Sequence, residues 1–329
     1  VVWVLVAGML AIWGTHKFAV VRQAAQEARE YGQYRLKRQL RRGGMGELYL
    51  AEHNFIHRPC VIKIIHPDKS GDRRALTRFE REVHTLATLT HWNIVQVYDH
   101  GTAADGTFYY AMEYLPGLDL ADLVAEAGPL PPGRVVHLLR QVCGALYEAH
   151  ASGLIHRDIK PHNIFATERG RVFDVAKLLD FGLVHELVDE GSNDRLTRDG
   201  AMVGTPAYMS PEQVGGATEL DARSDLYSLG AVAYFMLTGR PPFERKNVQQ
   251  VFRAHLVDPV LAPSRYAAGL PKDLESIVLR CLEKDPAARF ADALNLEKAL
   301  AECSAASDWS SAMAADWWRD WVLRTSDPG

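Results

Sequence analysis

The feature that most constrains the fold of this chain is a change of hydrophobic periodicity near Gly117. Before that residue, short runs rich in β-branched and aromatic side chains follow one another, and turn residues separate most of them, which is typical of strands. These runs are 34–40, 47–52, 60–65, 94–100 and 107–113. After it, apolar residues recur at helical spacing, which predicts helices. The helical segments are 131–152, 224–238, 273–282 and 292–302.

This order predicts an α+β protein, in which a small β-rich part is followed by a larger, mainly helical part. One further helix, at 74–89, is predicted between the third and fourth strands, because its apolar residues lie near a helical period. The segment 224–238 is nearly all apolar and is followed by Gly239, a residue that commonly ends helices. A helix that is apolar on every side is expected to be buried on every side.

The composition excludes several classes of protein. Of the 329 residues, 47% are hydrophobic and 24% are charged, and the net charge is −4. This is ordinary for a globular protein, and it provides no basic surplus for nucleic acid, which we do not expect as a partner. The four cysteines are widely separated and form no CxxC pair. A disulfide framework or a cysteine zinc site is therefore not expected.

The N-terminal segment is an uninterrupted apolar run over 1–14, and 18–21 is apolar again. Fourteen helical residues span about 21 Å, whereas the hydrocarbon core of a bilayer is about 30 Å thick. Because the chain begins without Met, we expect that 1–21 is a truncated transmembrane helix and 22–33 a juxtamembrane linker. Lys and Arg predominate after the run, which predicts a cytoplasmic position for the rest of the chain. The alternative is a cytoplasmic protein whose first helix packs on the soluble domain.

The C-terminal tail, 303–329, contains Trp309, Trp317, Trp318 and Trp321 among small and acidic residues. We favour a helix whose indole rings dock on the folded domain. The alternative is contact with a partner or a membrane interface, where tryptophan is also common.

A glycine-rich turn lies between the first two predicted strands, with Gly43, Gly44 and Gly46. Glycines let the backbone approach a polyphosphate closely with its N–H groups facing it, although glycine hairpins without ligands are common. Lys63 follows on the third strand, between apolar neighbours that point to the opposite face. A half-buried ammonium needs an anionic partner, and Glu82 is the candidate, with Glu80 as the competing choice.

The most specific motif is the loop 154–164, which contains Asp158, Lys160 and Asn163. These residues offer a base, a cation and an amide oxygen around one reacting centre. Phosphoryl transfer needs those parts: a group that accepts the hydroxyl proton, a positive charge on the phosphoryl group and a magnesium ligand. Asp180 then follows a short apolar strand and begins the motif Asp180-Phe181-Gly182. Its carboxylate is a ligand that Mg²⁺ prefers.

With these motifs in this order, residues 34–302 resemble a eukaryotic-type serine/threonine protein kinase of the bacterial form. The resemblance implies a two-lobed fold, with lobes at 34–115 and 116–302. It implies transfer of the ATP γ-phosphate to Ser or Thr hydroxyls of protein substrates, with Mg²⁺, or Mn²⁺ as an alternative. A pseudokinase or ATP-binding scaffold is the competing class, and the intact set of charged residues argues against it.

The family's roles carry over to matching positions of this chain. Lys63 would bind the α- and β-phosphates and pair with Glu82, Asp158 would be the catalytic base, and Lys160 would contact the γ-phosphate. Asn163 and Asp180 would hold the metal. The remaining ATP contacts implied are Leu40, Gly43, Gly44, Met45, Gly46 and Leu48 around the glycine turn, the gatekeeper Met112, the backbone of Glu113 and Leu115 for adenine, and Asp119 for ribose.

Two positions depart from the family pattern. Arg41 stands where the first glycine of the turn is usual, and Val61 stands where an alanine is usual beside adenine. We expect both to be compatible with ATP binding.

The resemblance continues downstream and implies regulation. Residues 204–212 resemble the end of an activation segment, in which Thr205, together with Lys160, points to the Ser/Thr branch. Arg157 precedes the base and implies control by a loop phosphate, for which Thr197 is our preferred site. Self-association would allow autophosphorylation there. Asp225 is expected to brace the catalytic loop, and Arg289 to pair with Glu212.

Overall fold

The computed structural model describes residues 30–43, 46–65, 83–103, 107–181, 206–217 and 219–326. The chain forms two compact units. The small unit comprises residues up to Leu76 and Gln96–Tyr114, and the large unit comprises Thr77–Val95 and Leu115–Gly329. Residues 83–95 are bonded to the large unit through Leu178. The Leu178 N–H donates to the Asn93 carbonyl, and the Leu178 carbonyl accepts from the Val95 N–H.

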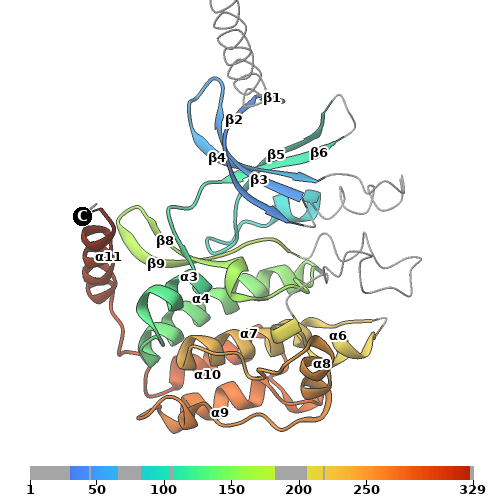
Figure 1. The fold of residues 1–329 in the computed structure, drawn as a ribbon, viewed down its shortest axis with the longest axis vertical. Coiled ribbons are helices and arrows are strands. Elements are labelled where there is room, and N and C mark those ends of the chain that lie inside the picture. The colour runs from blue at the N-terminus through green and yellow to red at the C-terminus, as the bar shows by residue number, and fades with distance from the viewer. Residues whose placement is uncertain are drawn as a thin grey trace, which may run out of the picture. The chain divides into compact units, whose positions relative to one another are not determined.

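The small unit is one antiparallel sheet with the strand order β1-β2-β3-β4-β6-β5 (Figure 1). The strands are β1 Glu30–Tyr31, β2 Tyr34–Gly43, β3 Gly46–His53, β4 Pro59–Ile65, β5 Val97–Thr102 and β6 Phe108–Glu113. The five predicted strands are confirmed, with two corrections. Strand β1 was not predicted and lies in the segment 22–33, which was expected to be a linker. The fourth run was expected to begin at Ile94, but that residue only forms an isolated bridge to Leu178 in the large unit, and β5 begins at Val97.

The core of the small unit lies on one face of this sheet. Ile62 and Ile64 of β4 are buried there against Tyr109 and Ala111 of β6. Because side chains alternate along a strand, Lys63 lies on the opposite face, as the sequence predicted.

The large unit is mainly helical, with a small sheet of three strands. Its strands are β7 Gly117–Asp119, β8 Ile164–Arg169 and β9 Val172–Leu178. Its α-helices are α3 Leu120–Ala127, α4 Pro132–Ala151, α6 Pro211–Gly215, α7 Ala222–Thr238, α8 Val248–Val257, α9 Lys272–Cys281, α10 Ala293–Glu302 and α11 Ser311–Ser326, and 83–88 is also helical. The four helices predicted after Gly117 correspond to α4, α7, α9 and α10, so the α+β class is confirmed.

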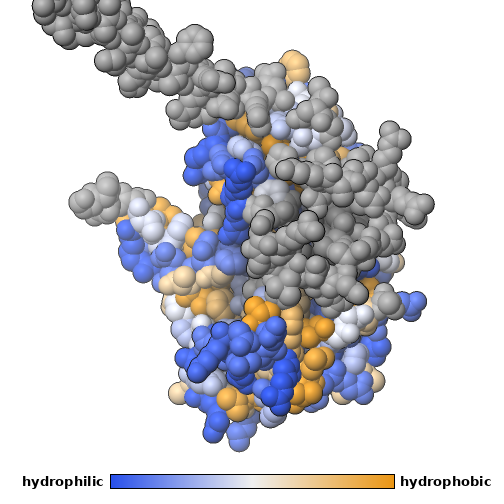
Figure 2. Space-filling view, turned by 45° about the vertical axis from the view of Figure 1, so that its right-hand side comes forward, coloured by the Kyte–Doolittle hydropathy of each residue, from blue (hydrophilic) through white to orange (hydrophobic). Residues whose placement is uncertain are grey.

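Three of the helices in the described residues were not predicted, α3, the short α6 and α8. In α8 the residues Val251, Ala254 and His255 are buried, whereas Leu256 and Val257 are exposed. Apolar side chains therefore lie on both sides of this helix, and the sequence shows no clean stripe. Figure 2 shows hydrophobic residues at the surface in the lower part of the view.

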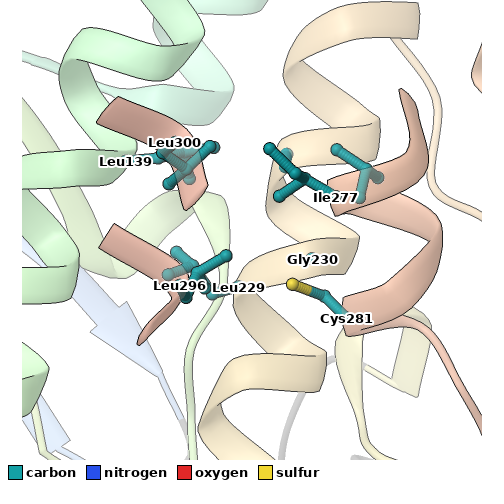
Figure 3. A pocket seen from close by; sticks show the side chains of 9 residues that line it. Leu139, Leu229, Gly230, Ile277, Cys281, Leu296 and Leu300 are labelled. Carbon is teal, nitrogen blue, oxygen red and sulfur yellow. The ribbon is translucent and has the colours of Figure 1, made fainter. Parts of the chain in front are cut away.

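The central helix of the large unit is α7, which is buried on nearly all sides as predicted. The Asp221 side chain caps its first turn, and Gly239 ends it in a left-handed conformation. A Cβ on Gly230 would lie 2.4 Å from the Cβ of Cys281, so only glycine allows α9 this close. Figure 3 shows Cys281 pointing from α9 toward Gly230, beside an apolar cavity of about 10 Å³. The space is too small and too apolar for a ligand.

The packing around α7 predicts a dependence of stability on pH. His255 is fully buried, and its ring nitrogen Nδ1 lies 2.9 Å from the Tyr227 hydroxyl. Burial, and then the Lys284 ammonium, lower the pKa of His255 from 6.5 to about 4. Between these values the unfolded chain binds a proton that the folded chain does not. The free energy of unfolding therefore falls as pH drops from 6.5 toward 4, by up to about 3 kcal/mol from this group.

Denaturant unfolding at pH 7.5 and pH 5 measures this loss. We expect His255→Gln to be less stable than wild type at pH 7.5 but to lose less stability on acidification. The matched control is His84→Gln, since His84 is an exposed histidine and should keep the wild-type pH dependence. Equal losses in wild type and His255→Gln would contradict the assignment.

No helix within the part of the chain that the structure describes is long and apolar enough to cross a membrane. The predicted membrane segment, 1–21, lies outside that part.

Candidate active site

The loop between α4 and β8 brings three predicted site residues together. The Asp158 carboxylate oxygen Oδ2 accepts hydrogen bonds from Lys160 Nζ at 2.6 Å and from Asn163 Nδ2 at 3.0 Å. The Asn163 amide also donates to the Asp158 carbonyl at 2.8 Å. The side chains of Asp158 and Lys160 are 14% and 17% exposed, so the carboxylate is accessible and yet held in place. A carboxylate beside a cation is thus present, and the role of Asp158 as the base stays a prediction.

Asp225 of α7 fixes the backbone of this loop. Its carboxylate accepts the N–H groups of His156 and Arg157 at 2.8 and 2.9 Å, and the His150 ring lies 2.8 Å away. Arg157 adopts a left-handed conformation, with φ of 64°, which is unfavourable for a residue with a side chain. The two N–H bonds to Asp225 hold that conformation, which confirms the predicted bracing role.

His156 connects the loop to the end of β9. The ring is buried, and its Nε2 atom lies 2.8 Å from the Leu179 carbonyl oxygen. Its Nδ1 atom accepts a hydrogen bond from the Asp158 N–H at 3.3 Å. Burial lowers the pKa of His156, so the ring is neutral and donates through Nε2. The Leu179 N–H donates to the Asn163 carbonyl at 2.8 Å. Asp180, the next residue, is therefore held next to the catalytic loop, and its φ of 51° is again left-handed.

The two residues predicted to bind Mg²⁺ carry side-chain oxygen atoms. Asn163 gives its amide nitrogen to Asp158, which leaves the amide oxygen for a cation, and Asp180 offers a carboxylate. Oxygen ligands of this kind are those that Mg²⁺ prefers. Within the described ranges, no group of three or more His, Cys, Asp or Glu side chains forms a metal cluster. Mg²⁺ commonly binds through one or two protein ligands together with substrate phosphates.

In the small unit, the glycine turn joins β2 to β3, and Gly43 pairs with Gly46. Gly46 has a φ of 138°, and a Cβ there would lie 2.1 Å from the Ile64 carbonyl oxygen. A side chain at position 46 would therefore clash with the backbone of β4, a requirement for glycine that the sequence did not reveal. Leu40 lies in β2 and Leu48 in β3, while Gly44 and Met45 lie outside the described residues.

Lys63 is only 8% exposed and lies between Leu48 of β3 and Tyr110 of β6. Its ammonium is 5.9 Å from the centre of the Tyr110 ring. The two candidate partners, Glu82 and Glu80, lie outside the described residues, so the predicted ion pair stays a prediction.

Of the residues assigned to adenine and ribose, Met112, Glu113 and Leu115 are buried. The Glu113 N–H donates to the Gln96 carbonyl at 2.9 Å, and the Glu113 carboxylate accepts from the Gln96 N–H at 3.0 Å. These bonds fix the end of β6, where adenine contact was predicted.

Asp119 has structural roles that were not predicted from the sequence. One carboxylate oxygen caps α3, accepting from the N–H groups of Ala121 and Asp122 at 2.9 Å, and the other lies 3.0 Å from the His162 ring. An Asp before an apolar run is a helix-start signal that was present in the sequence. The ribose contact stays a prediction, since it would compete with these bonds.

The end of the activation segment is tied to the large unit. Arg289 donates to both Glu212 carboxylate oxygens at 2.7 and 2.9 Å, and Ser224 donates to Glu212 at 2.6 Å. Burial alone would raise the pKa of Glu212, but the hydrogen bonds from Arg289 and Ser224 lower it. The predicted ion pair is confirmed. Thr197 and Thr205 lie outside the described residues.

Comparison with known proteins identifies this arrangement. Residues 34–302 match the family described as protein kinase domain. The chain belongs to the protein kinase family. Serine/threonine-protein kinase pkn3 of Myxococcus xanthus is 39% identical over 262 residues, which is 79% of this chain and 48% of the relative. Serine/threonine-protein kinase PknD of Mycobacterium tuberculosis is 39% identical over 272 residues, which is 82% of this chain and 40% of the relative.

This kinase chain therefore spans less than half the length of those relatives. Among solved structures, the kinase domain of Mycobacterium tuberculosis PknI has a TM-score of 0.66 and 29% identity, covering 84% of this chain and 98% of that one. The kinase fold predicted from sequence is confirmed.

Proposed function

We propose that this chain is a serine/threonine protein kinase that transfers the γ-phosphate of ATP to hydroxyl groups of proteins. The observation that carries the proposal is the position of Asp158 within 2.6 Å of Lys160 and 3.0 Å of Asn163, on a loop that Asp225 holds. The names of the relatives pkn3 and PknD support it.

In this proposal each residue has one task. Asp158 accepts the proton of the attacking hydroxyl, and Lys160, bonded to the same carboxylate, supplies positive charge to the transferring phosphoryl group. Asn163 and Asp180 hold Mg²⁺, or Mn²⁺ in its place, which neutralises phosphate charge when bound. Lys63, paired with Glu82, binds the α- and β-phosphates.

The other predicted ATP contacts also belong to the proposal. The glycine turn covers the phosphates, Glu113 and Leu115 contact adenine beside the gatekeeper Met112, and Asp119 contacts ribose. These contacts would be made by Leu40, Gly43, Gly44, Met45, Gly46, Leu48, Met112, Glu113, Leu115 and Asp119.

Regulation is proposed to act through Thr197. A phosphate there adds roughly two negative charges and would pair with Arg157, and Thr205 is the third residue proposed to be regulatory. Self-association would let one copy phosphorylate another. Segment 1–21 is proposed as a membrane anchor, with the kinase domain in the cytoplasm.

Phosphosite mapping of the purified chain after incubation with Mg-ATP and a generic protein substrate tests this function. We expect phosphate on Ser and Thr only, Thr197 among the sites, and at least about 10²-fold slower labelling in the matched Asp158→Asn protein. Phosphate on Tyr alone, or none at all in wild type, would contradict the proposal, and the latter would favour an ATP-binding scaffold. Unchanged activity of Thr197→Ala would contradict the regulatory role only.

A further inference from the structure

The large unit contains a buried ion pair away from the catalytic loop. Arg134, at the start of α4, donates through Nε and Nη2 to the two carboxylate oxygens of Asp174 in β9, both at 2.8 Å. The two residues are 1% and 0% exposed. Removing two charges from water is costly unless further hydrogen bonds complete their surroundings.

The C-terminal tail supplies these further hydrogen bonds to the Arg134–Asp174 pair. Trp309 Nε1 donates to Asp174 Oδ2 at 3.0 Å, and Trp318 Nε1 donates to Oδ1 at 2.7 Å. The Arg134 guanidinium lies 5.0 Å from the centre of the Trp309 ring and 4.1 Å from that of Trp317. We call Trp309, Trp317 and Trp318 the tail clamp. The Asp174 carboxylate thus accepts four N–H donors, two of them from the tail, and the predicted docking of the indoles is confirmed.

The backbone conformations of α4 and of β9 are both adapted to the contact with the tail. A Cβ on Gly133 would lie 2.7 Å from the backbone of Asp308, so α4 accepts the tail only because glycine stands there. Asp174 itself has a φ of 53°, an unfavourable conformation for a residue with a side chain. Figure 1 shows α11, which carries Trp317 and Trp318, beside β8 and β9.

A continuous set of hydrogen bonds leads from Asp174 along β9. The Asp174 carbonyl accepts from Gln141 Nε2 at 2.9 Å, and Gln141 Oε1 accepts the Ala176 N–H at 3.0 Å. Asn93 Nδ2 donates to the Ala176 carbonyl at 2.7 Å, and the Asn93 carbonyl accepts the Leu178 N–H at 2.8 Å. Two residues further lies Asp180. The tail therefore contacts β9, the strand that leads to Asp180, the proposed metal ligand.

We propose that the tail clamp positions β9 and, through it, Asp180, so that Trp309 and Trp318 are positioning residues for the kinase reaction although they lie outside the family's domain. The inference rests on the proposed metal role of Asp180. Groups that orient metal ligands influence metal affinity roughly tenfold or more. A tail that only adds buried surface would leave the metal dependence unchanged.

The test compares two Trp→Phe variants in the tail. Trp318→Phe removes the N–H that Asp174 accepts and keeps an aromatic ring. Trp321→Phe makes the same chemical change in the same helix, but Trp321 Nε1 is buried without a hydrogen-bond partner in the described part of the chain. The two variants remove the same atoms, so a larger effect of Trp318→Phe reflects the bond with Asp174 and the deeper burial of Trp318. Trp309→Phe, which also removes a bond to Asp174, distinguishes the two causes.

Two measurements are made on the full chain. Hydrogen exchange of the metal-free protein reports on peptides that cover 172–180, and Trp318→Phe is expected to exchange about tenfold faster there than wild type or Trp321→Phe. A Mg²⁺ titration of kinase activity is expected to show a roughly tenfold higher half-saturating concentration for Trp318→Phe, with activity restored at high Mg²⁺. Trp309→Phe should shift both readouts in the same direction, and it serves if Trp318→Phe does not fold.

Asp180→Asn separates this inference from the proposed function. If Asp180→Asn loses the magnesium response while Trp318→Phe matches Trp321→Phe in both readouts, the tail has no positioning role and the inference is overturned, whatever the thermal stability. If Asp180→Asn keeps the wild-type magnesium response, Asp180 is not the metal ligand, and the inference is overturned with that part of the proposed function.

Discussion

Asp158→Asn is expected to lower kcat by about 10²- to 10⁴-fold and to leave the KM for ATP nearly unchanged. Asparagine has the same shape as aspartate and keeps an oxygen that accepts from Lys160 and Asn163, which now donate to Oδ2 at 2.6 and 3.0 Å. It cannot accept the proton of the substrate hydroxyl at neutral pH. The loss therefore falls on the chemical step, and steady-state kinetics with varied ATP measure it.

The matched control for this result is Asp122→Asn. Asp122 is an exposed carboxylate in the first turn of α3, so its loss should leave kcat unchanged. A kcat of Asp158→Asn within about threefold of wild type would assign the base to another group. A large rise in the KM for ATP would instead indicate that the carboxylate contributes to nucleotide binding.

The sequence predicted which residues gather at this site better than it predicted the contacts that hold them in place. Asp158, Lys160 and Asn163 lie within six residues of one another, so their spacing alone placed them in one loop. The strands of the small unit were predictable for a similar reason, since each is a short run with its own turn signals. Helix α8 was missed because its apolar residues lie on both sides.

The contacts that the sequence could not predict join distant segments. Asp174 carries no local signal, yet it accepts hydrogen bonds from Arg134, forty residues before it, and from Trp318, 144 residues after it. The tryptophans indicated docking, but nothing in the sequence identified the acceptor. In the same way, the reason for Gly46 became visible only when the Ile64 carbonyl was found against it.

Arg289→Ala is expected to lower the free energy of unfolding by about 3–5 kcal/mol, because it leaves the half-buried Glu212 carboxylate without its countercharge. The guanidinium donates to both Glu212 oxygens and also to the carbonyls of Glu283, Arg223 and Lys284, at 2.8 to 3.0 Å. The variant therefore removes three further hydrogen bonds, and Glu212→Gln, which keeps an acceptor, should cost less. Denaturant unfolding of the full chain measures both.

The nearby pair Arg223–Asp221 provides the control, since its side chains are 35% and 52% exposed and 2.6 Å apart. Arg223→Ala should cost no more than about 1 kcal/mol, because water replaces the partner of an exposed ion. Acidification gives a second check. The lowered pKa of Glu212 means that its contribution is present above the usual value of 4.5 and is lost as pH falls through the folded-state pKa. Arg289→Ala should therefore lose less stability than wild type over that acidic range, and an equal loss would show that the ion pair does not stabilise the folded chain.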